Sequence, residues 1–175
     1  MNSLSIILPY SFALESADLN WYDILFAIDN GFLPHQSAIE HAVSQLGKNE
    51  EYSETVLELA CLMPSEAVHP HSIQPYLGEL AKDIPEQEKS ATKQKMLYLV
   101  LKWVFEHKCD YDDPLEVVEV IYADFDYPKD ISIFIRYMPL SQPDLGSVDL
   151  NTERLFHNWN TFLESQKVFF SNSKN

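Results

Sequence analysis

Apolar residues return every three or four positions between residues 113 and 125, at Leu115, Val118, Ile121, Tyr122 and Phe125. This spacing is typical of a helix that buries one face. Asp113 and Pro114 stand just before it, in the order of an N-cap and a first helical proline, and Glu116 adds a capping-box acid. The pattern predicts a helix that begins after Asp113.

The segment 128–139 predicts a second helix, since a proline stands at each end of it. Its apolar positions are Ile131, Phe134, Ile135 and Met138. The buried faces of both helices need a large apolar partner. Only residues 95–105, just upstream, are apolar enough to serve as that partner.

The longest predicted helix covers residues 85–107. Its first half is polar, whereas MLYLVLKWVF in its second half is apolar on nearly every side and should run through the centre of the core. A loop is predicted over 140–148, because it contains Pro143 and Gly146. The last helix is expected to start near Asn151 or Thr152 and to bury Leu155, Trp159, Phe162 and Leu163.

The first half of the chain predicts shorter helices. One is capped by Asp18 or Asn20 and ends at the pair 30–31, Asn-Gly, which accepts a left-handed backbone. The next opens at Pro34, stops at Gly47 and should pair with the first in antiparallel fashion. Further helical segments are predicted over 50–62, over 65–68, and over 72–80 with Ser72 as the cap.

These elements predict an all-α fold, a single-domain bundle of about eight helices over residues 1–175. An α-solenoid of helical pairs over 21–81 is the alternative. Residues 4–16 are apolar around Pro9 and are expected to form either a short strand or an extended arm, within an N-terminal arm 1–17. A flexible tail is predicted over 171–175.

Composition supports a chain that folds alone, since 46% of its residues are hydrophobic. Cys61 and Cys109 belong to no disulfide or metal pattern, which favours a reducing cytosol. The first residues lack the basic stretch and cleavage site of a signal peptide, and charges interrupt every apolar run before it could span a membrane. A cytoplasmic monomer is therefore expected.

Charge is the strongest compositional feature: 27 acidic and 12 basic residues give a net charge of −15. This charge repels phosphate backbones and anionic lipids, so we expect neither nucleic acid nor membrane as a partner.

Eight acids and one base, Lys129, lie in residues 110–130. The tyrosines there at 111 and 127 fall in predicted turns. Exposed tyrosine among carboxylates is typical of a surface that binds a basic protein, although a merely solvated acidic face is the competing interpretation. The predicted binding residues are Asp110, Tyr111, Asp112, Asp113, Glu116, Glu119, Asp124, Asp126, Tyr127 and Asp130.

Catalytic and metal motifs are weak. Asp124 and Asp126 form a lone DxD without the glycine and glutamate of an EF-hand. His69 and His71 flank Pro70 with Cys61 nearby, but no fourth zinc ligand accompanies them. No nucleophile elbow, phosphate loop or HExxH is present. We therefore predict no metal, no cofactor and no enzymatic activity, and a metal-dependent hydrolase is the least favoured hypothesis.

Two segments, NWYDILFAIDNGFLPHQSAIEHA (20–42) and LYLVLKWVFEHKCDYDDPLEVVEVIYADFDYPKDISIFIRYMP (97–139), together with NTERLFHNW, resemble a bacterial family of small acidic proteins of unknown function. The tract IYADFDYP followed by FIRYMP is the most specific part. Members of that family resemble the immunity proteins of contact-dependent growth inhibition and polymorphic-toxin loci. The resemblance implies a protein that binds and neutralises the toxin domain of a sibling cell.

Resemblance and charge together predict an immunity protein. Its partner would be the C-terminal domain of a cognate toxin, basic and expected to be a nuclease, whose active-site surface the acids of residues 110–130 occlude. The alternative is a helical adaptor that binds a cellular protein through an apolar groove, with the charge serving only solubility.

Overall fold

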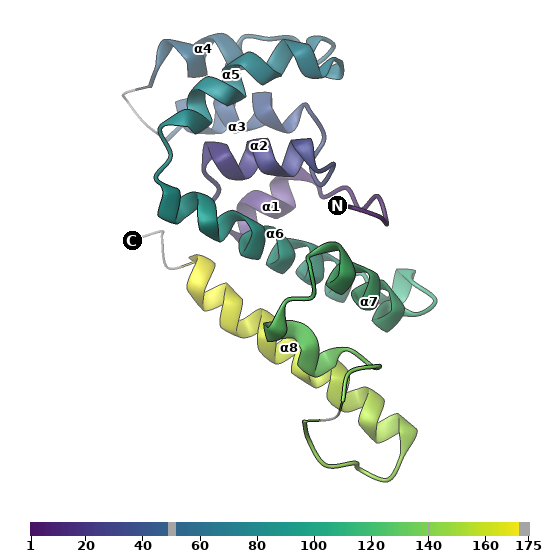
Figure 1. Ribbon diagram of the computed structural model, residues 1–175. Coiled ribbons are helices and arrows are strands. Elements are labelled where there is room, and N and C mark those ends of the chain that lie inside the picture. Colours follow the sequence, from purple (N-terminus) through teal and green to yellow (C-terminus); the bar gives the residue numbers. More distant parts are fainter. Residues whose placement is uncertain (49–51, 140, 172–175) are drawn as a thin grey trace. The chain divides into compact units, whose positions relative to one another are not determined.

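The computed structural model describes residues 1–48, 52–139 and 141–171, and every regular element in these ranges is a helix (Figure 1). The predicted all-α class is therefore confirmed. Residues 172–175 of the predicted tail lie outside the described residues. Within the ranges given, no helix combines the length and the apolar character needed to cross a membrane.

Contacts along the chain define two compact units, which we call the N-unit (Ser5–Met96) and the C-unit (Met1–Leu4 with Leu97–Asn175). The helix α6 (Glu86–Glu106) contributes residues to both units. The expectation of one domain over residues 1–175 stays a prediction.

The N-unit is a set of short helices packed in succession: α1 (Tyr10–Ser16), α2 (Trp21–Asp29), α3 (Ser37–Leu46), α4 (Glu54–Ala60) and α5 (Pro70–Lys82). Helix α2 packs against α3 and α5, α3 packs against α4, and α4 packs against α5 (Figure 1). The predicted short turn of helix is η1 (Glu66–Val68). Apolar faces such as those with Ile24, Leu59 and Leu77, each 0% exposed, supply the core.

Both ends of α2 follow from the local sequence. The Asn20 side chain accepts a hydrogen bond from the Asp23 amide at 2.9 Å, and the Asp23 carboxylate accepts one from the Asn20 amide at 2.9 Å, a capping box. At the other end the Phe32 amide donates to the Ala27 carbonyl at 2.7 Å, and the Gly31 amide to the Ile28 carbonyl at 3.0 Å. This is a Schellman motif, with Gly31 in the left-handed region at φ +73°. Asn20, rather than Asp18, is the cap.

A buried carboxylate fastens α2 to the first half of α6. Asp23 is only 1% exposed. Its Oδ1 accepts a hydrogen bond from Thr92 Oγ1 at 2.5 Å, and its Oδ2 forms an ion pair with Lys95 Nζ. A buried charge is stable only when it is paired and hydrogen-bonded, and this one meets both conditions.

A buried histidine joins α1, α2 and α3. His41 is 1% exposed; its Nδ1 lies 3.0 Å from the Tyr10 hydroxyl, and its ring meets the Trp21 ring edge-on at 4.6 Å between centroids. Burial, with a smaller contribution from the positive charge of Lys48, lowers the pKa of His41 from 6.5 to about 4.

The N-terminal expectation was wrong over residues 10–16, which form α1 rather than a strand or an extended arm. Pro9, with φ −62° and ψ 136°, stands immediately before the helix as its N-cap. Tyr10, Ala13 and Ser16 then recur at helical spacing and are buried. The proline that we interpreted as interrupting an extended segment therefore starts a helix.

Three other helix starts differ from prediction. Helix α3 begins at Ser37, because Pro34 opens a turn rather than the helix itself. Helix α4 begins at Glu54 behind Ser53, whose Oγ accepts from the Val56 amide at 3.3 Å. Residues 52–53 are not helical, and residues 50–51 lie outside the described ranges. Helix α5 begins at Pro70, so the predicted cap, Ser72, lies inside it.

The C-unit contains the second half of α6, then η2 (Lys108–Asp110), α7 (Pro114–Asp124), η3 (Lys129–Phe134) and α8 (Val148–Ser171). The prediction for α6 is confirmed, since Leu97 to Leu101 are at most 4% exposed. Trp159 on α8 is fully buried; its ring meets Phe105 edge-on at 5.1 Å and stacks on Phe134 at 6.1 Å. Of the four predicted core residues of α8, Trp159, Phe162 and Leu163 are buried, whereas Leu155 is only partly buried.

Two C-unit predictions need correction. The predicted helix over 128–139 is a 3₁₀ helix that ends at Phe134. Ile135 is extended, and the next residue, Arg136, pairs with acids of α7 instead of continuing the helix. Helix α8 starts at Val148, so the predicted caps at 151 and 152 lie in its first turn, and the Asn151 amide donates to the Ser147 carbonyl at 3.0 Å. The loop is confirmed over 141–147; residue 140 lies outside the described ranges.

Candidate functional site

Helix α7 begins where the sequence predicts. Asp113 Oδ1 accepts hydrogen bonds from the amides of Leu115 at 3.1 Å and Glu116 at 3.2 Å, and Pro114 occupies the first helical position. Leu115, Val118, Ile121 and Tyr122 are buried beneath the helix. Asp113, one of the predicted binding residues, therefore has a structural role as the N-cap of α7.

Arg136 connects two more of the predicted acids. Its Nη1 donates to Asp113 Oδ2 at 2.6 Å, while its Nε and Nη2 donate to the two oxygens of Glu119 at 2.9 and 3.1 Å. Burial by itself would raise the pKa of Asp113, but the hydrogen bonds from Arg136 and from the Glu116 amide hold that pKa below its ordinary value of 3.8. Asp113 and Glu119 share the single positive charge of Arg136, so the pairing offsets only part of their negative charge and gives both acids a structural role.

The C-terminal end of α7 is a second Schellman motif. The Tyr127 amide donates to the Tyr122 carbonyl at 2.9 Å, and the Asp126 amide donates to the Ala123 carbonyl at 3.1 Å. Asp126 occupies the position that usually belongs to glycine, with φ +63°, and Tyr127 follows with φ +56°. Two successive non-glycine residues in the left-handed region are strained, and such strain is concentrated at functional sites.

Three tyrosine rings gather at this end of the helix. The buried Tyr122 ring meets Tyr127 edge-on at 5.2 Å and Tyr137 at 6.3 Å between centroids. Tyr127 and Tyr137 are 59% and 58% exposed. The pKa of Tyr137 is raised, first by burial and then by its neighbours Tyr122, Tyr127 and Glu119. An exposed pair of tyrosines, each in contact with the buried Tyr122, therefore lies beside carboxylates.

Asp124 performs a structural task. Its Oδ2 accepts from the Ser3 amide at 2.7 Å and its Oδ1 from the Ser3 hydroxyl at 2.6 Å. These bonds fix the first residues of the C-unit to the end of α7. This contact could not be predicted from the sequence, since 121 positions separate the two residues.

The ten predicted residues divide between the two ends of α7, which is about 16 Å long. Asp110, Asp112 and Glu116 are exposed at its N-terminal end, and we call them the N-terminal acidic group. Asp126 and Asp130 are exposed beyond its C-terminal end and form the C-terminal acidic group, which Tyr127 accompanies. Tyr111 is half-buried; its pKa is raised first by burial and then by Asp110.

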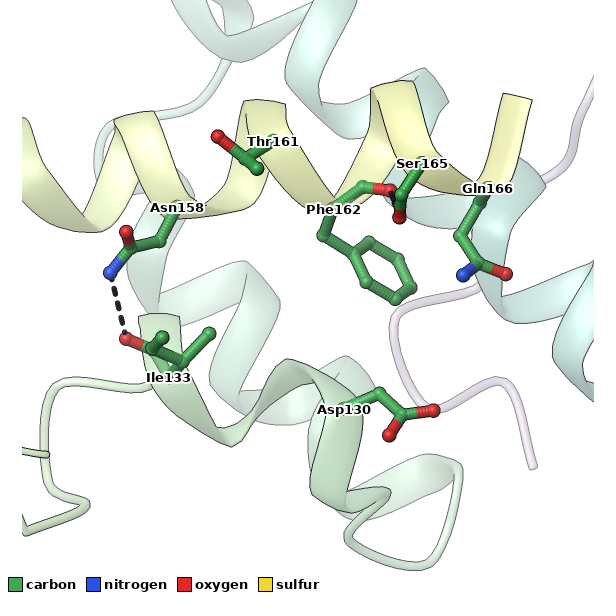
Figure 2. A pocket seen from close by; sticks show the side chains of 7 residues that line it. All are labelled: Asp130, Ile133, Asn158, Thr161, Phe162, Ser165 and Gln166. Carbon is green, nitrogen blue, oxygen red and sulfur yellow. Dashed lines mark hydrogen bonds between the residues drawn. The ribbon is translucent and has the colours of Figure 1, made fainter. Parts of the chain in front are cut away.

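Asp130 also borders an open groove of about 360 Å³ between η3 and α8 (Figure 2). Its lining combines one carboxylate, two apolar side chains, two hydroxyls and two amides: Asp130, Ile133, Asn158, Thr161, Phe162, Ser165 and Gln166. Sequence reasoning missed the α8 residues. Their signal was a polar stripe, since positions 158, 161 and 165 recur at helical spacing.

Metal ligation finds no structural basis in the ranges that the structure describes, because no three His, Cys, Asp or Glu side chains gather there as ligands would. The lone DxD of Asp124 and Asp126 is part of the helix end instead.

The chain belongs to the family DUF2247, an uncharacterized protein conserved in bacteria, whose model matches residues 10–167. No curated protein and no solved structure matches the chain.

Proposed function

We propose that this DUF2247 protein acts by binding a basic protein, in the manner of an immunity protein that neutralises a cognate antibacterial toxin. The observation that carries the proposal is the pair Tyr127 and Tyr137, both exposed and both packed on the buried Tyr122 beside carboxylates. The interface would comprise these tyrosines with the N-terminal and C-terminal acidic groups.

Rigid tyrosines suit this role because they contribute large contact area with little loss of conformational entropy. Tyr127 is held by the Schellman motif and by its edge-on contact with Tyr122. Aromatic anchors of this kind dominate the binding energy of protein interfaces, and truncating one costs 2 kcal/mol or more.

The acids supply speed and selectivity. A toxin that cuts RNA or DNA carries positive charge where it holds the phosphate backbone, and exposed carboxylates would replace those phosphates. Since Arg136 offsets part of the charge of Asp113 and Glu119, the attraction would come mainly from the N-terminal and C-terminal acidic groups. The whole chain, with a net charge of −15, adds a long-range contribution.

The tyrosine pair can be tested against any toxin domain that is found encoded beside the gene. The double variant Tyr127→Ala, Tyr137→Ala should weaken binding by about a hundredfold or more and abolish protection of cells that express the toxin. Tyr52→Ala is a matched control, because Tyr52 is a 50% exposed tyrosine of the N-unit. Equal losses in the two variants, or no binding of the toxin by the native protein, would refute the proposal.

A matched pair of charge variants separates local from overall charge. Neutralising Asp110, Asp112, Asp126 and Asp130 to asparagine should slow association far more than neutralising four exposed N-unit acids, Glu15, Asp18, Glu58 and Asp83. The native association rate should also fall steeply above about 0.15 M salt, where the screening length is about 8 Å.

The adaptor alternative has one observation in its favour: Val43 on α3 and Leu57 on α4 are apolar side chains that remain 54% and 42% exposed. An adaptor that docks its partner there would keep binding when the four C-unit acids are neutralised. It would lose binding on Val43→Ser with Leu57→Ser. The same two sets of variants therefore distinguish the two functions.

A further inference from the structure

The groove between η3 and α8 has an apolar floor and a charged rim. Phe162, 9% exposed, and Ile133, 42% exposed, contribute the apolar surface. Asp130 borders the groove on the side of η3, and the other charged or polar lining residues come from α8 (Figure 2). The pocket is therefore amphipathic, with a negative charge at its edge.

Asn158 is one of the residues that line this groove. Its Nδ2 donates one hydrogen to the Ile133 carbonyl at 3.3 Å (Figure 2). It donates the other to Gln142 Oε1 at 3.1 Å. An amide nitrogen has two hydrogens, and both are used here. The carbonyl oxygen Oδ1 is the part of this side chain that can bind a ligand.

The two hydroxyls behave alike. Thr161 Oγ1 donates its hydrogen to the His157 carbonyl at 3.0 Å, and Ser165 Oγ donates to the Phe162 carbonyl at 2.7 Å. A hydroxyl has one hydrogen, so each retains only lone pairs. Together with the Asp130 carboxylate, these side chains offer hydrogen-bond acceptors and a negative charge.

We propose that this groove receives an arginine side chain of the protein partner. Guanidinium has five donors and no acceptor, which complements a groove whose hydroxyls and Asn158 offer acceptors. Its charge would pair with Asp130, and its apolar stem would lie on Phe162 and Ile133. A lysine has three donors on one atom and reaches separated acceptors less well. This inference rests on the proposed function and names the chemistry of its contact.

The groove can be tested without the partner, on the full ¹⁵N-labelled chain titrated with Nα-acetyl-arginine amide. We expect chemical-shift changes in the Asn158 side-chain amide and in the backbone amides of residues 161–166. The lysine analogue should bind more weakly. The citrulline analogue, which keeps the shape but lacks the charge, should weaken binding by about fivefold.

Substitutions complete the experiment. Asp130→Asn should weaken binding of the arginine probe by about fivefold, the limit expected for an exposed ion pair. Glu153→Gln, an exposed acid of α8 outside the groove, should leave binding unchanged. The absence of shifts at these residues, or equal binding of the arginine and citrulline probes, would overturn the arginine site.

The two proposals fail separately. If the probe binds but no basic toxin does, the groove stands and the immunity function falls. If the toxin binds and Asp130→Asn leaves its affinity and that of the probe unchanged, the immunity function stands and the arginine site falls.

Discussion

Helices α2 and α7 end in the same hydrogen-bonded motif and use it differently. At the end of α2 the left-handed residue is Gly31, and the residue after it, Phe32, is 2% exposed. At the end of α7 the left-handed residue is Asp126, and the residue after it, Tyr127, is 59% exposed. The motif that ends α2 therefore places the next side chain in the core, whereas the motif that ends α7 places it in solvent.

Glycine at the end of α2 and aspartate at the end of α7 differ in the conformational energy of the left-handed backbone. Glycine adopts the left-handed region without steric cost, whereas an L-residue there loses about 1–2 kcal/mol, less for Asp because its short side chain can hydrogen-bond locally. Helix α7 bears this strain at two successive positions. Because backbone strain of this kind is concentrated at functional sites, this helix end, rather than that of α2, is the candidate site.

The largest predicted effect concerns the other end of α2. Asp23→Ala should lower the free energy of unfolding by about 3 kcal/mol, because it leaves the partly buried Lys95 ammonium, 12% exposed, without its counter-ion. Urea denaturation followed by circular dichroism measures the loss. Asp110→Ala, at an exposed C-unit carboxylate, should stay within about 0.5 kcal/mol of the native protein. Similar losses of stability in the two variants would contradict the conclusion that Asp23 stabilises the fold whereas Asp110 does not.

The second effect is a pH dependence of stability that comes from His41, the buried histidine of the N-unit. His41 has a folded pKa of about 4 against 6.5 unfolded, so the unfolded chain takes up its proton first as the pH falls. Its stabilising effect is complete above pH 6.5 and disappears toward pH 4. The free energy of unfolding should thus decrease by about 2 kcal/mol between pH 7 and pH 5.

The control for this pH dependence is the variant His41→Phe. Its free energy of unfolding should not show the decrease between pH 7 and pH 5. A variant with the same slope as the native protein would show that another group titrates.

The smallest effect tests the two helix ends directly. Gly31→Ala should destabilise the protein by about 1 kcal/mol, because it forces an L-residue to φ +73°. Asp126→Gly should instead stabilise it by about 0.5–1 kcal/mol, because it relieves strain at φ +63°. Thermal denaturation of both variants provides the comparison. A loss of stability in Asp126→Gly would mean that contacts of the Asp126 side chain outweigh the strain.

The sequence predicted those elements whose signals are local. Asn20 and Gly31 delimit α2, and Asp113 with Pro114 starts α7, because a cap acts on amides within three or four residues of itself. Pro9 shows the limit of such signals: a proline both interrupts a strand and begins a helix, and only the packing of Tyr10 and Ala13 decides between the two.

The candidate site was predictable in part. Tyr111 and Tyr127 were both predicted to be exposed because they lie in turns. Tyr127 is exposed, but Tyr111 is half-buried. The pairing of Arg136 with two acids of α7 was not predictable, because it depends on the extended conformation of Ile135 and lies outside the window in which the charges were counted. A count of charges within one stretch of sequence overestimates the net surface charge when a basic residue from outside that stretch folds back and pairs with its acids.

The bonds between Ser3 and Asp124 have a practical consequence for anyone who purifies this protein. An affinity tag fused before Met1 would emerge beside the end of α7 and could cover the tyrosines there. Pull-down assays should therefore carry the tag after residue 175, or remove an N-terminal tag by proteolysis before any search for binding partners begins.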